Sequence, residues 1–339
     1  MTPEEKFELM TRNLQEVIGE DELKEKLNSG KEISLYWGTM PTGSISIAYF
    51  FPMLKVADFL KAGCNVKILI ADLHAALDSV PWIDLDKRYD YYKKAIETML
   101  ETIGVDHSRL EFVKGSEIQL APEYTYDVLQ LSSLTTVTGA TKAASEVVKA
   151  GKNPKVASLI YPLMQVMDEE YLHVDAQFGG MDQRKIMVLA RELLPKIGYD
   201  SRIELINPLI RGLVGEKMSS SIKASKIDLI DGEEEVKKKI NKADCVTGDI
   251  NNGLMALLKY FIFVYKGDRG ESFTIERLEK FGGNLIYKNY EEVEKDFVEQ
   301  KLHPMDLKNG VAKEINILLK NFRENKELKR LHEIAYPSD

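Results

Sequence analysis

The chain has 339 residues, a length that suits two domains or one large domain with an extension. Its 46 lysines and arginines stand against 54 aspartates and glutamates, so the formal net charge is −8. This balance excludes a protein that coats nucleic acid through bulk positive charge, although it is compatible with a local positive patch. Cys64 and Cys245 lie far apart in no metal-binding spacing, so we expect neither a structural zinc site nor a disulfide scaffold.

The first residues are acidic and polar, unlike a signal or transit peptide. No apolar run approaches the roughly 18 residues that a membrane helix needs. Free thiols suit a reducing compartment. We therefore expect a cytoplasmic protein with no membrane partner.

Apolar residues at helical spacing predict two short amphipathic helices within residues 4–29. A strand at 33–37, a turn at 38–43, an apolar helix at 46–62 and a second strand at 66–72 follow. The second strand is an almost continuous apolar run, typical of strands buried on both faces of a parallel sheet. The order strand, glycine turn, helix, strand is that of a βαβ unit, so the sequence predicts an α/β fold.

The middle of the chain is mainly helical in pattern and contains one further short strand. We predict helices at 84–104, 122–150 and 158–170, a strand at 174–178 and a helix at 182–194. Residues 203–231 are rich in loop formers, and densely charged helical patterns follow Gly232. We place the domain boundary near residue 231, which gives domains 1–231 and 232–339.

The turn from Thr42 to Ser46 follows a predicted parallel strand and precedes a helix. Helix N-termini carry unsatisfied N–H groups and suit phosphate, and ligands of open α/β sheets bind at the carboxyl ends of the strands. A plain turn between strand and helix is an equally good interpretation of these residues alone. Neither a dinucleotide fingerprint nor a P-loop is present.

Tyr161, Gln165 and Asp168 lie four and three residues apart, so they share one face of the predicted helix 158–170. The other faces of that helix are apolar, which indicates that the helix is buried. A buried carboxylate needs polar partners. We favour a small polar ligand over an internal polar network as the source of those partners.

Two glycine-containing strings add further candidate sites. In Gly179-Gly180-Met181-Asp182-Gln183, the glycines allow a ligand to approach the backbone, and Asp182 suits a ribose hydroxyl pair or a simple helix N-cap. Residues 212–221 contain Lys217-Met218-Ser219-Ser220-Ser221, a specific string whose ammonium and hydroxyl groups suit a pyrophosphate leaving group. An ordinary polar loop is the alternative for the second string.

Further short strings extend the pattern over nearly the whole chain. They are Tyr36-Trp37-Gly38-Thr39, Ala71-Asp72-Leu73-His74-Ala75, Tyr161-Pro162-Leu163-Met164-Gln165, Gly179 through Lys185, Lys217 through Ser221, Lys280-Phe281-Gly282-Gly283 and His303 through Lys308. In these strings and their order the chain resembles the class I aminoacyl-tRNA synthetases, and most closely the tyrosyl-tRNA synthetases of eukaryotic and archaeal cytosols.

The resemblance implies a Rossmann-like, parallel-sheet catalytic domain with an inserted helical segment at about 108–150 that forms much of a homodimer interface. It also implies a mainly helical C-terminal domain that binds the anticodon. The family activates L-tyrosine with ATP and Mg²⁺ to tyrosyl-adenylate, releases pyrophosphate and esterifies the 3′-terminal adenosine of tRNA-Tyr. We expect no metal bound by the protein itself.

The resemblance also assigns residues to the two small substrates. For tyrosine it assigns Tyr36 and Asp168 to the phenol hydroxyl, Tyr161, Gln165 and Gln183 to the amino group, and Gly38 to the same pocket. For ATP it assigns Gly180 and Asp182 to the ribose, and Gly43, Ser46, Lys217, Met218, Ser219, Ser220 and Ser221 to the phosphates, the last three with Lys217 in a KMSKS-like loop.

For tRNA, the resemblance places Arg184 at the first base pair of the acceptor stem. It places Phe281 and His303 in a stack on the first anticodon base, with Asp306 hydrogen-bonded to that base. Stacking with an edge hydrogen bond is how single-stranded RNA bases are usually read.

One position departs from the family pattern, because Ser46 stands where the class signature begins with histidine. The resemblance implies that this imidazole helps to hold the ATP phosphates in the transition state, where one donor is typically worth a few kcal/mol. Ser46 can still donate one hydrogen bond, and Ser44 and His74 are candidates to compensate. Two other functions stay open: a tryptophanyl-tRNA synthetase, and an RNA-binding paralogue with impaired activation.

Overall fold

The computed structural model describes residues 1–147, 153–214 and 226–337. The chain divides into two compact units. The first comprises Met1–Thr42, Lys55–Lys93 and Val105–Leu209, and the second comprises Gly43–Leu54, Lys94–Gly104 and Ile210–Asp339. The domain boundary predicted near residue 231 stays a prediction.

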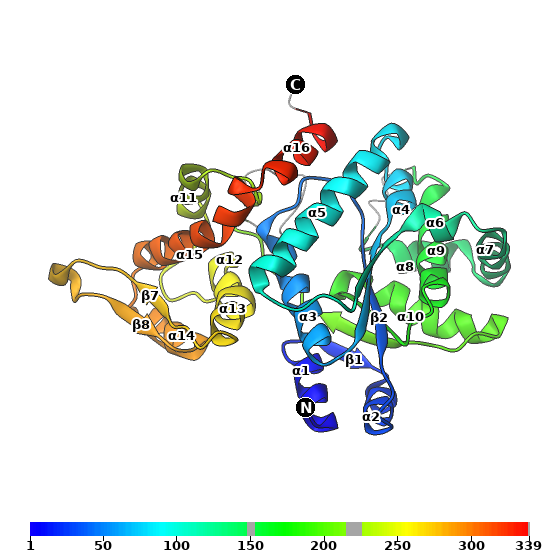
Figure 1. Cartoon of the computed structure of the whole chain (residues 1–339), viewed down its shortest axis with the longest axis horizontal. Helices are drawn as coiled ribbons and strands as arrows, with labels where there is room; N and C mark the ends of the chain where they lie inside the picture. Colours follow the sequence, from blue (N-terminus) through cyan, green and yellow to red (C-terminus); the bar gives the residue numbers. More distant parts are fainter. Residues whose placement is uncertain (148–152, 215–225, 338–339) are drawn as a thin grey trace. The chain divides into compact units, whose positions relative to one another are not determined.

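The first unit is built on a mainly parallel sheet with the strand order β1-β6-β5-β2-β3-β4 (Figure 1). Its strands are β1 (Glu16–Ile18), β2 (Ser34–Thr39), β3 (Asn65–Ile70), β4 (Leu110–Lys114), β5 (Ala176–Gly180) and β6 (Ile203–Asn207). Only β1 runs antiparallel to its neighbour within this sheet. The parallel α/β fold is therefore confirmed.

The direction in which successive strands are added reverses between β2 and β5. From β2 the chain proceeds outward to β3 and β4, whereas β5 and β6 lie on the other side of β2. In doubly wound sheets, ligands bind outside the carboxyl ends of the strands at this reversal point. The topology therefore predicts a ligand site among the residues that follow β2 and β5.

Helices cover both faces of the sheet. Phe59 of α3 (Phe50–Lys61) packs edge-on against Phe178 of β5 at 5.2 Å between ring centroids. Gln177 precedes Phe178 and so points to the opposite face, in register with Tyr36. That face is covered by α9 (Ala157–Tyr171), whose C-cap residue Leu172 belongs to the same apolar cluster as Tyr36.

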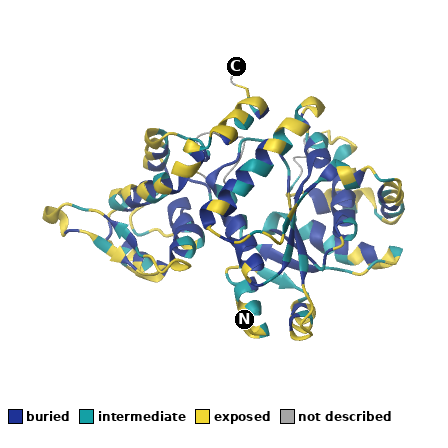
Figure 2. Cartoon of the chain, in the orientation of Figure 1, coloured by how far each residue is buried: buried dark blue, intermediate teal, exposed yellow. Residues whose placement is uncertain are grey.

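The remaining helices of the first unit join these elements. They are α1 (Pro3–Thr11), α2 (Glu20–Asn28), α4 (Asp72–Leu77), α5 (Leu85–Ile103, whose last turns belong to the second unit), α6 (Gly115–Gln119), α7 (Pro122–Leu134), α8 (Val137–Ala144) and α10 (Arg184–Leu193). Figure 2 shows the sheet strands largely buried and many exposed residues along α7. None of the described helices is long and apolar enough to cross a membrane.

Several predicted elements need correction. The helix expected over 122–150 is two helices, because Thr135 is extended and the side chain of Thr136 caps α8 by accepting from the Gly139 N–H at 3.0 Å. Strands β1, β4 and β6 were not expected. The hydrophobic pattern does not predict β6, because Glu204 interrupts its apolar run. All residues of the strand except the last are nevertheless buried. Residues 110–114, inside the predicted insertion, form a sheet strand.

The second unit is mainly helical, as expected. Its helices are α11 (Glu233–Asn241), α12 (Gly253–Leu257), α13 (Phe263–Gly267), α14 (Tyr290–Val298), α15 (Pro304–Glu324) and α16 (Lys326–Ala335). An unexpected antiparallel pair, β7 (Phe273–Ile275) and β8 (Leu285–Tyr287), lies among them. Phe50 stacks on Phe261 at 4.6 Å and meets Phe322 edge-on, so the start of α3 packs into this unit.

Candidate functional site

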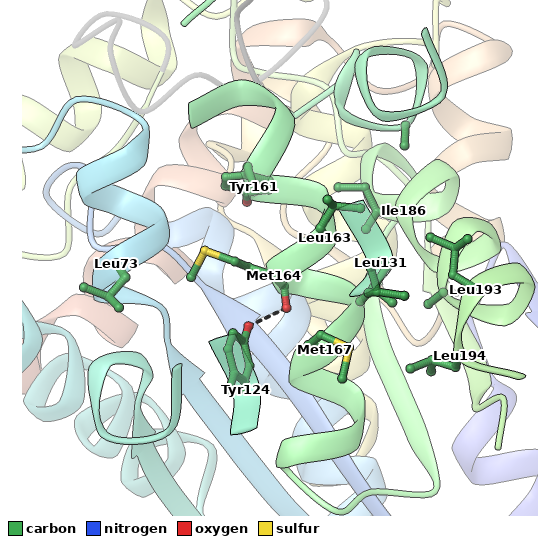
Figure 3. Close-up of a cluster of buried hydrophobic side chains, with 13 residues drawn as sticks. Leu73, Tyr124, Leu131, Tyr161, Leu163, Met164, Met167, Ile186, Leu193 and Leu194 are labelled. Atoms are coloured by element: carbon green, nitrogen blue, oxygen red, sulfur yellow. Dashed lines mark hydrogen bonds between the residues drawn. The ribbon is translucent and has the colours of Figure 1, made fainter. Parts of the chain in front are cut away.

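A cluster of buried polar side chains lies between α9 and the sheet of the first unit. Its centre is Asp168, whose Oδ1 accepts hydrogen bonds from Gln119 Nε2 at 2.7 Å and from the Tyr124 hydroxyl at 2.8 Å. The same hydroxyl lies 2.6 Å from the Met164 carbonyl (Figure 3). Since a phenol has one proton, Tyr124 donates to one of these two acceptors at a time.

Several atoms of this cluster have unused hydrogen-bonding capacity, among them His74 Nε2 and Gln119 Oε1. Asp168 Oδ2 has no hydrogen-bond partner among the described residues, and His74 Nε2 lies 3.9 Å away. The buried hydroxyl of Tyr36 also lacks a partner within the described part of the chain. An unsatisfied buried polar atom costs about 1–3 kcal/mol, so a polar ligand that paired with these atoms would be stabilised.

Burial sets the charges of the cluster. It raises the pKa of Asp168 to about 7, against the opposing effect of the hydrogen bonds from Gln119 and Tyr124. Burial also lowers the pKa of His74 to about 4, so this imidazole is neutral at physiological pH. The ring of His74 packs edge-on against Tyr161 at 4.6 Å. The cluster is therefore polar, and Asp168 is the group in it that changes charge near neutral pH.

The stripe predicted on α9 is confirmed as buried, since Tyr161, Gln165 and Asp168 all have less than a tenth of their surface exposed. Gln165 Nε2 donates to Gln183 Oε1 at 3.2 Å, which joins α9 to the segment after β5. Gly38 lies at the exposed end of β2, two residues beyond Tyr36. The structure thus brings together most residues expected at the tyrosine site.

The glycine pair at the end of β5 lies close to the ends of two side chains. A Cβ on Gly180 would lie 2.7 Å from Asp182 Oδ1, and one on Gly179 would lie 2.8 Å from Met187 Cε. Asp182 sits within a short 3₁₀ turn, and the N-cap position of α10 is held by Gln183. The N-cap alternative for Asp182 therefore does not apply. Its carboxylate lies beside Gly180, which has no side chain.

The turn after β2 belongs to the second unit from Gly43 onward. Ser46 is buried and forms an isolated antiparallel bridge with Asp228. It precedes a 3₁₀ turn at Ile47–Tyr49 and makes no side-chain capping hydrogen bond there. The predicted phosphate residues Lys217, Met218, Ser219, Ser220 and Ser221 lie outside the described residues.

Three residues predicted to contact an RNA base gather in the second unit. Phe281, in the loop between β7 and β8, exposes 61% of its surface. His303 caps α15 by accepting from the Met305 N–H at 3.1 Å, and Asp306 lies in the first turn of that helix. Arg277 donates to the Gly283 carbonyl at 2.9 Å and lies 3.8 Å from Asp306, so it connects the loop to the helix.

Arg184, the residue predicted at the acceptor stem, is in the first unit. It makes a bidentate pair with Glu16 of β1, at 2.5 and 2.8 Å. Its hydrogen bond to Glu16 raises the pKa of Arg184 and lowers that of Glu16. Because Arg184 keeps 42% of its side chain exposed, it remains accessible to a ligand.

Sequence reasoning missed several buried polar residues. Gln119 and Tyr124 hold Asp168 but carry no local pattern, since they lie more than 40 residues before it in the chain. Glu169 and Glu204 are completely buried, and none of their carboxyl oxygens has a hydrogen-bond partner among the described residues. Gln177 lies in register between Tyr36 and Glu204, so a polar row crosses β2, β5 and β6.

Comparison with known proteins gives a consistent result. The family described as tRNA synthetases class I (W and Y) matches residues 28–320. The chain is 52% identical to the cytoplasmic tyrosine–tRNA ligase of Gallus gallus, over 99% of this chain and 64% of the relative, and 47% identical to that of Saccharomyces cerevisiae, over 99% and 88%. A tyrosyl-tRNA synthetase from Archaeoglobus fulgidus, crystallised with L-tyrosine, has a TM-score of 0.88 at 40% identity, over 97% of this chain and 99% of that one.

Proposed function

The chain belongs to the class I tRNA synthetases of the W and Y family, and from that premise we propose that it is a tyrosine–tRNA ligase. It spans 64% of the length of the vertebrate relatives that it matches. In the proposed reaction, L-tyrosine and ATP form tyrosyl-adenylate and pyrophosphate, and the tyrosyl group passes to the 3′-terminal adenosine of tRNA-Tyr. The relatives' names support this activity and a cytoplasmic location.

The observation that carries the proposal is the buried Tyr36 hydroxyl, which has no hydrogen-bond partner among the described residues and feels the charge of Asp168. A phenol hydroxyl between them donates to the carboxylate and accepts from Tyr36, which uses the unsatisfied capacity of both atoms. Phenylalanine leaves both atoms unpaired in a buried site. Tryptophan offers an indole N–H, which can donate but cannot accept from Tyr36. The pocket therefore favours tyrosine over both.

For activation, we propose in-line attack of the tyrosine carboxylate on the α-phosphorus of ATP, with ATP entering as its Mg²⁺ complex. Gln165 and Gln183 with Tyr161 orient the amino group, and Asp182 beside Gly180 binds the ribose. Positioning and charge stabilisation account for most of the rate in such transfers. Lys217 and the serines after it are proposed to neutralise the departing pyrophosphate.

For tRNA, we propose that residues 1–231 carry activation and residues 232–339 bind the anticodon. The exposed ring of Phe281, held near the start of α15 through Arg277, suits stacking on one base, with His303 as the second platform and Asp306 as the hydrogen-bond acceptor. Arg184, in the first part, is proposed to contact the acceptor stem.

We also propose a homodimer through the helices after β4. Helix α7 and the segments beside it expose several apolar side chains, although soluble monomers rarely expose large apolar patches. These are Leu120, Tyr126, Leu129, Leu134 and Val137, exposed by between 46% and 69%. A second copy of the chain is the partner expected to cover them.

An ATP–pyrophosphate exchange assay with individual amino acids tests the activation step. We expect exchange with tyrosine, and far less with tryptophan or phenylalanine at equal concentration. Strong exchange with tryptophan would replace the proposal by a tryptophanyl enzyme. No exchange with tyrosine would favour an RNA-binding paralogue.

Aminoacylation of tRNA-Tyr tests the anticodon assignment. Phe281→Ala removes one stacking platform, so we expect aminoacylation at low tRNA to fall roughly tenfold or more, since stacking is worth about 1–3 kcal/mol per base. Exchange should be unchanged. Ile286→Ala, which removes a similarly exposed apolar side chain from β8, is the matched control. Equal losses in both variants would contradict the assignment.

A further inference from the structure

The C-terminal helix α16 places an imidazole on the turn that follows β2. His332 Nε2 lies 3.0 Å from the hydroxyl oxygen of Ser44, and the same oxygen lies 2.5 Å from Asp228 Oδ2. All three residues belong to the second unit. They come from segments that are far apart in the chain, since Ser44 and His332 are 288 positions apart.

The chemistry of the three groups fixes the direction of these hydrogen bonds. An ionised carboxylate only accepts, so the single proton of Ser44 is donated to Asp228. The Ser44 oxygen must then accept from His332, which carries its proton on Nε2. Burial lowers the pKa of His332 while Asp228 opposes that change, and the charges of Lys226 and Glu333 also act on it. The result is a directed chain from imidazole to hydroxyl to carboxylate.

Residues 226–229 also hold the backbone of the turn. Lys226 Nζ donates to the Ser44 carbonyl at 2.8 Å and lies 3.7 Å from Asp228. The Ile47 N–H donates to the Ile227 carbonyl at 2.9 Å, and the Leu229 N–H donates to the Ile45 carbonyl at 3.2 Å. The turn is therefore fixed by backbone pairing, by an ammonium group and by the side chain of Ser44.

A turn that binds phosphate must present its N–H groups in one conformation, and a glycine next to a serine gives little conformational restriction by itself. The hydrogen bond from the His332 imidazole of α16 restricts the conformation of Ser44, which directly follows Gly43 in the proposed phosphate-binding turn. Asp228 and Lys226 also hold Ser44, the first through its hydroxyl and the second through its carbonyl. Nothing in the local sequence of α16 indicates this contact, because its amphipathic pattern alone leaves His332 as one of several polar residues.

We propose that His332 is a positioning residue for ATP in the activation step. Acting through Ser44, it holds residues 43–46 in the conformation that receives the triphosphate, and so makes the C-terminal helix part of the adenylation machinery. The inference rests on the proposed tyrosine activation. A residue near the C-terminus, His332, would then affect the first chemical step. This role is separate from any contact that the second unit makes with tRNA.

The test is ATP–pyrophosphate exchange with the full-length chain, varying ATP at saturating tyrosine and then the reverse. For His332→Ala we expect kcat/KM for ATP to fall about fivefold to tenfold, the worth of one hydrogen bond, while KM for tyrosine changes less than twofold. His332→Gln, which keeps an N–H donor at a similar reach, should recover most of the loss. Lys329→Ala, an exposed change on the same helix, is the matched control.

Ser44→Ala completes the test and needs no change in α16. Because His332 acts through Ser44, the double variant should lose no more than Ser44→Ala alone. Additive losses, or a His332→Ala variant that behaves like Lys329→Ala, would overturn the inference, as would a parallel fall in tyrosine affinity and melting temperature. If the unmodified chain shows no exchange with any amino acid, the proposed function fails; if only the variants behave as the control, the inference alone fails.

Discussion

Two consecutive residues of α9, Asp168 and Glu169, show how differently one buried helix can treat two carboxyl groups. Both are essentially inaccessible to solvent. Asp168 accepts from Gln119 and Tyr124, whereas Glu169 interacts electrostatically with Glu204 and no hydrogen-bond donor is found for it among the described residues. The two carboxyl groups are therefore equally removed from water. They differ in whether hydrogen-bond donors compensate the free-energy cost of burial.

The difference in partners gives the two acids different charge states. Two donors limit the rise in the pKa of Asp168 to about 7, so a large fraction is ionised at neutral pH and can accept from a phenol. Burial raises the pKa of Glu169 well above its ordinary value, and burial together with Glu169 raises that of Glu204. A buried acid with donors becomes a recognition group, and one without donors is kept protonated.

The largest expected effect comes from removing the recognition acid. Asp168→Ala leaves the tyrosine hydroxyl without its acceptor, so kcat/KM for tyrosine should fall by about 30-fold to 3,000-fold, as for truncation of one member of a buried charged pair at about 2–5 kcal/mol. The value for ATP should change far less. Exchange kinetics with each substrate varied would measure both, and equal losses would contradict the role of Asp168.

A smaller effect should follow from removing one donor to Asp168. Tyr124→Phe is expected to lower kcat/KM for tyrosine by roughly tenfold at pH 7, because hydrogen bonds to charged groups are worth about 1.5–3 kcal/mol. Since the substrate needs the ionised acid, kcat/KM for tyrosine should rise with pH through about 7 in the unmodified chain.

Loss of the donor raises the pKa of Asp168, so the midpoint of this rise should move to higher pH in Tyr124→Phe. Tyr265→Phe makes the same change in the second unit and is the control. A pH profile that is identical in the variant and the unmodified chain would show that Asp168 is not the titrating group.

The smallest effect concerns stability and the acid pair without donors. Folding raises the pKa of Glu169 and Glu204, so the folded chain binds more protons and its stability falls as pH rises above the unfolded values near 4.5. Glu204→Gln removes one ionisable group, and we expect a melting temperature a few degrees higher than that of the unmodified chain at pH 9, with little difference at pH 5.

Thermal unfolding at several pH values checks this expectation. Glu192→Gln, an exposed change on α10, controls for the loss of one surface charge. If Glu204→Gln has the same pH dependence as the control, the pair does not hold its proton in the folded state.

Local sequence patterns were sufficient for a defined part of this protein. They predicted the parallel α/β class and the helix that buries Tyr161, Gln165 and Asp168 on one face. These features depend on periodicity, which can be read within a few positions of the chain.

Tertiary structure decided which groups meet. The donors to Asp168, the contact between α9 and Glu204 of β6, and the imidazole of His332 on Ser44 join segments separated by between about 35 and nearly 300 residues. Periodicity shows which face of an element is buried, but the packing of other elements against that face determines the partners. Asp168 and Glu169 are neighbours in sequence, and only their long-range neighbours make one a ligand group and the other a buried neutral acid.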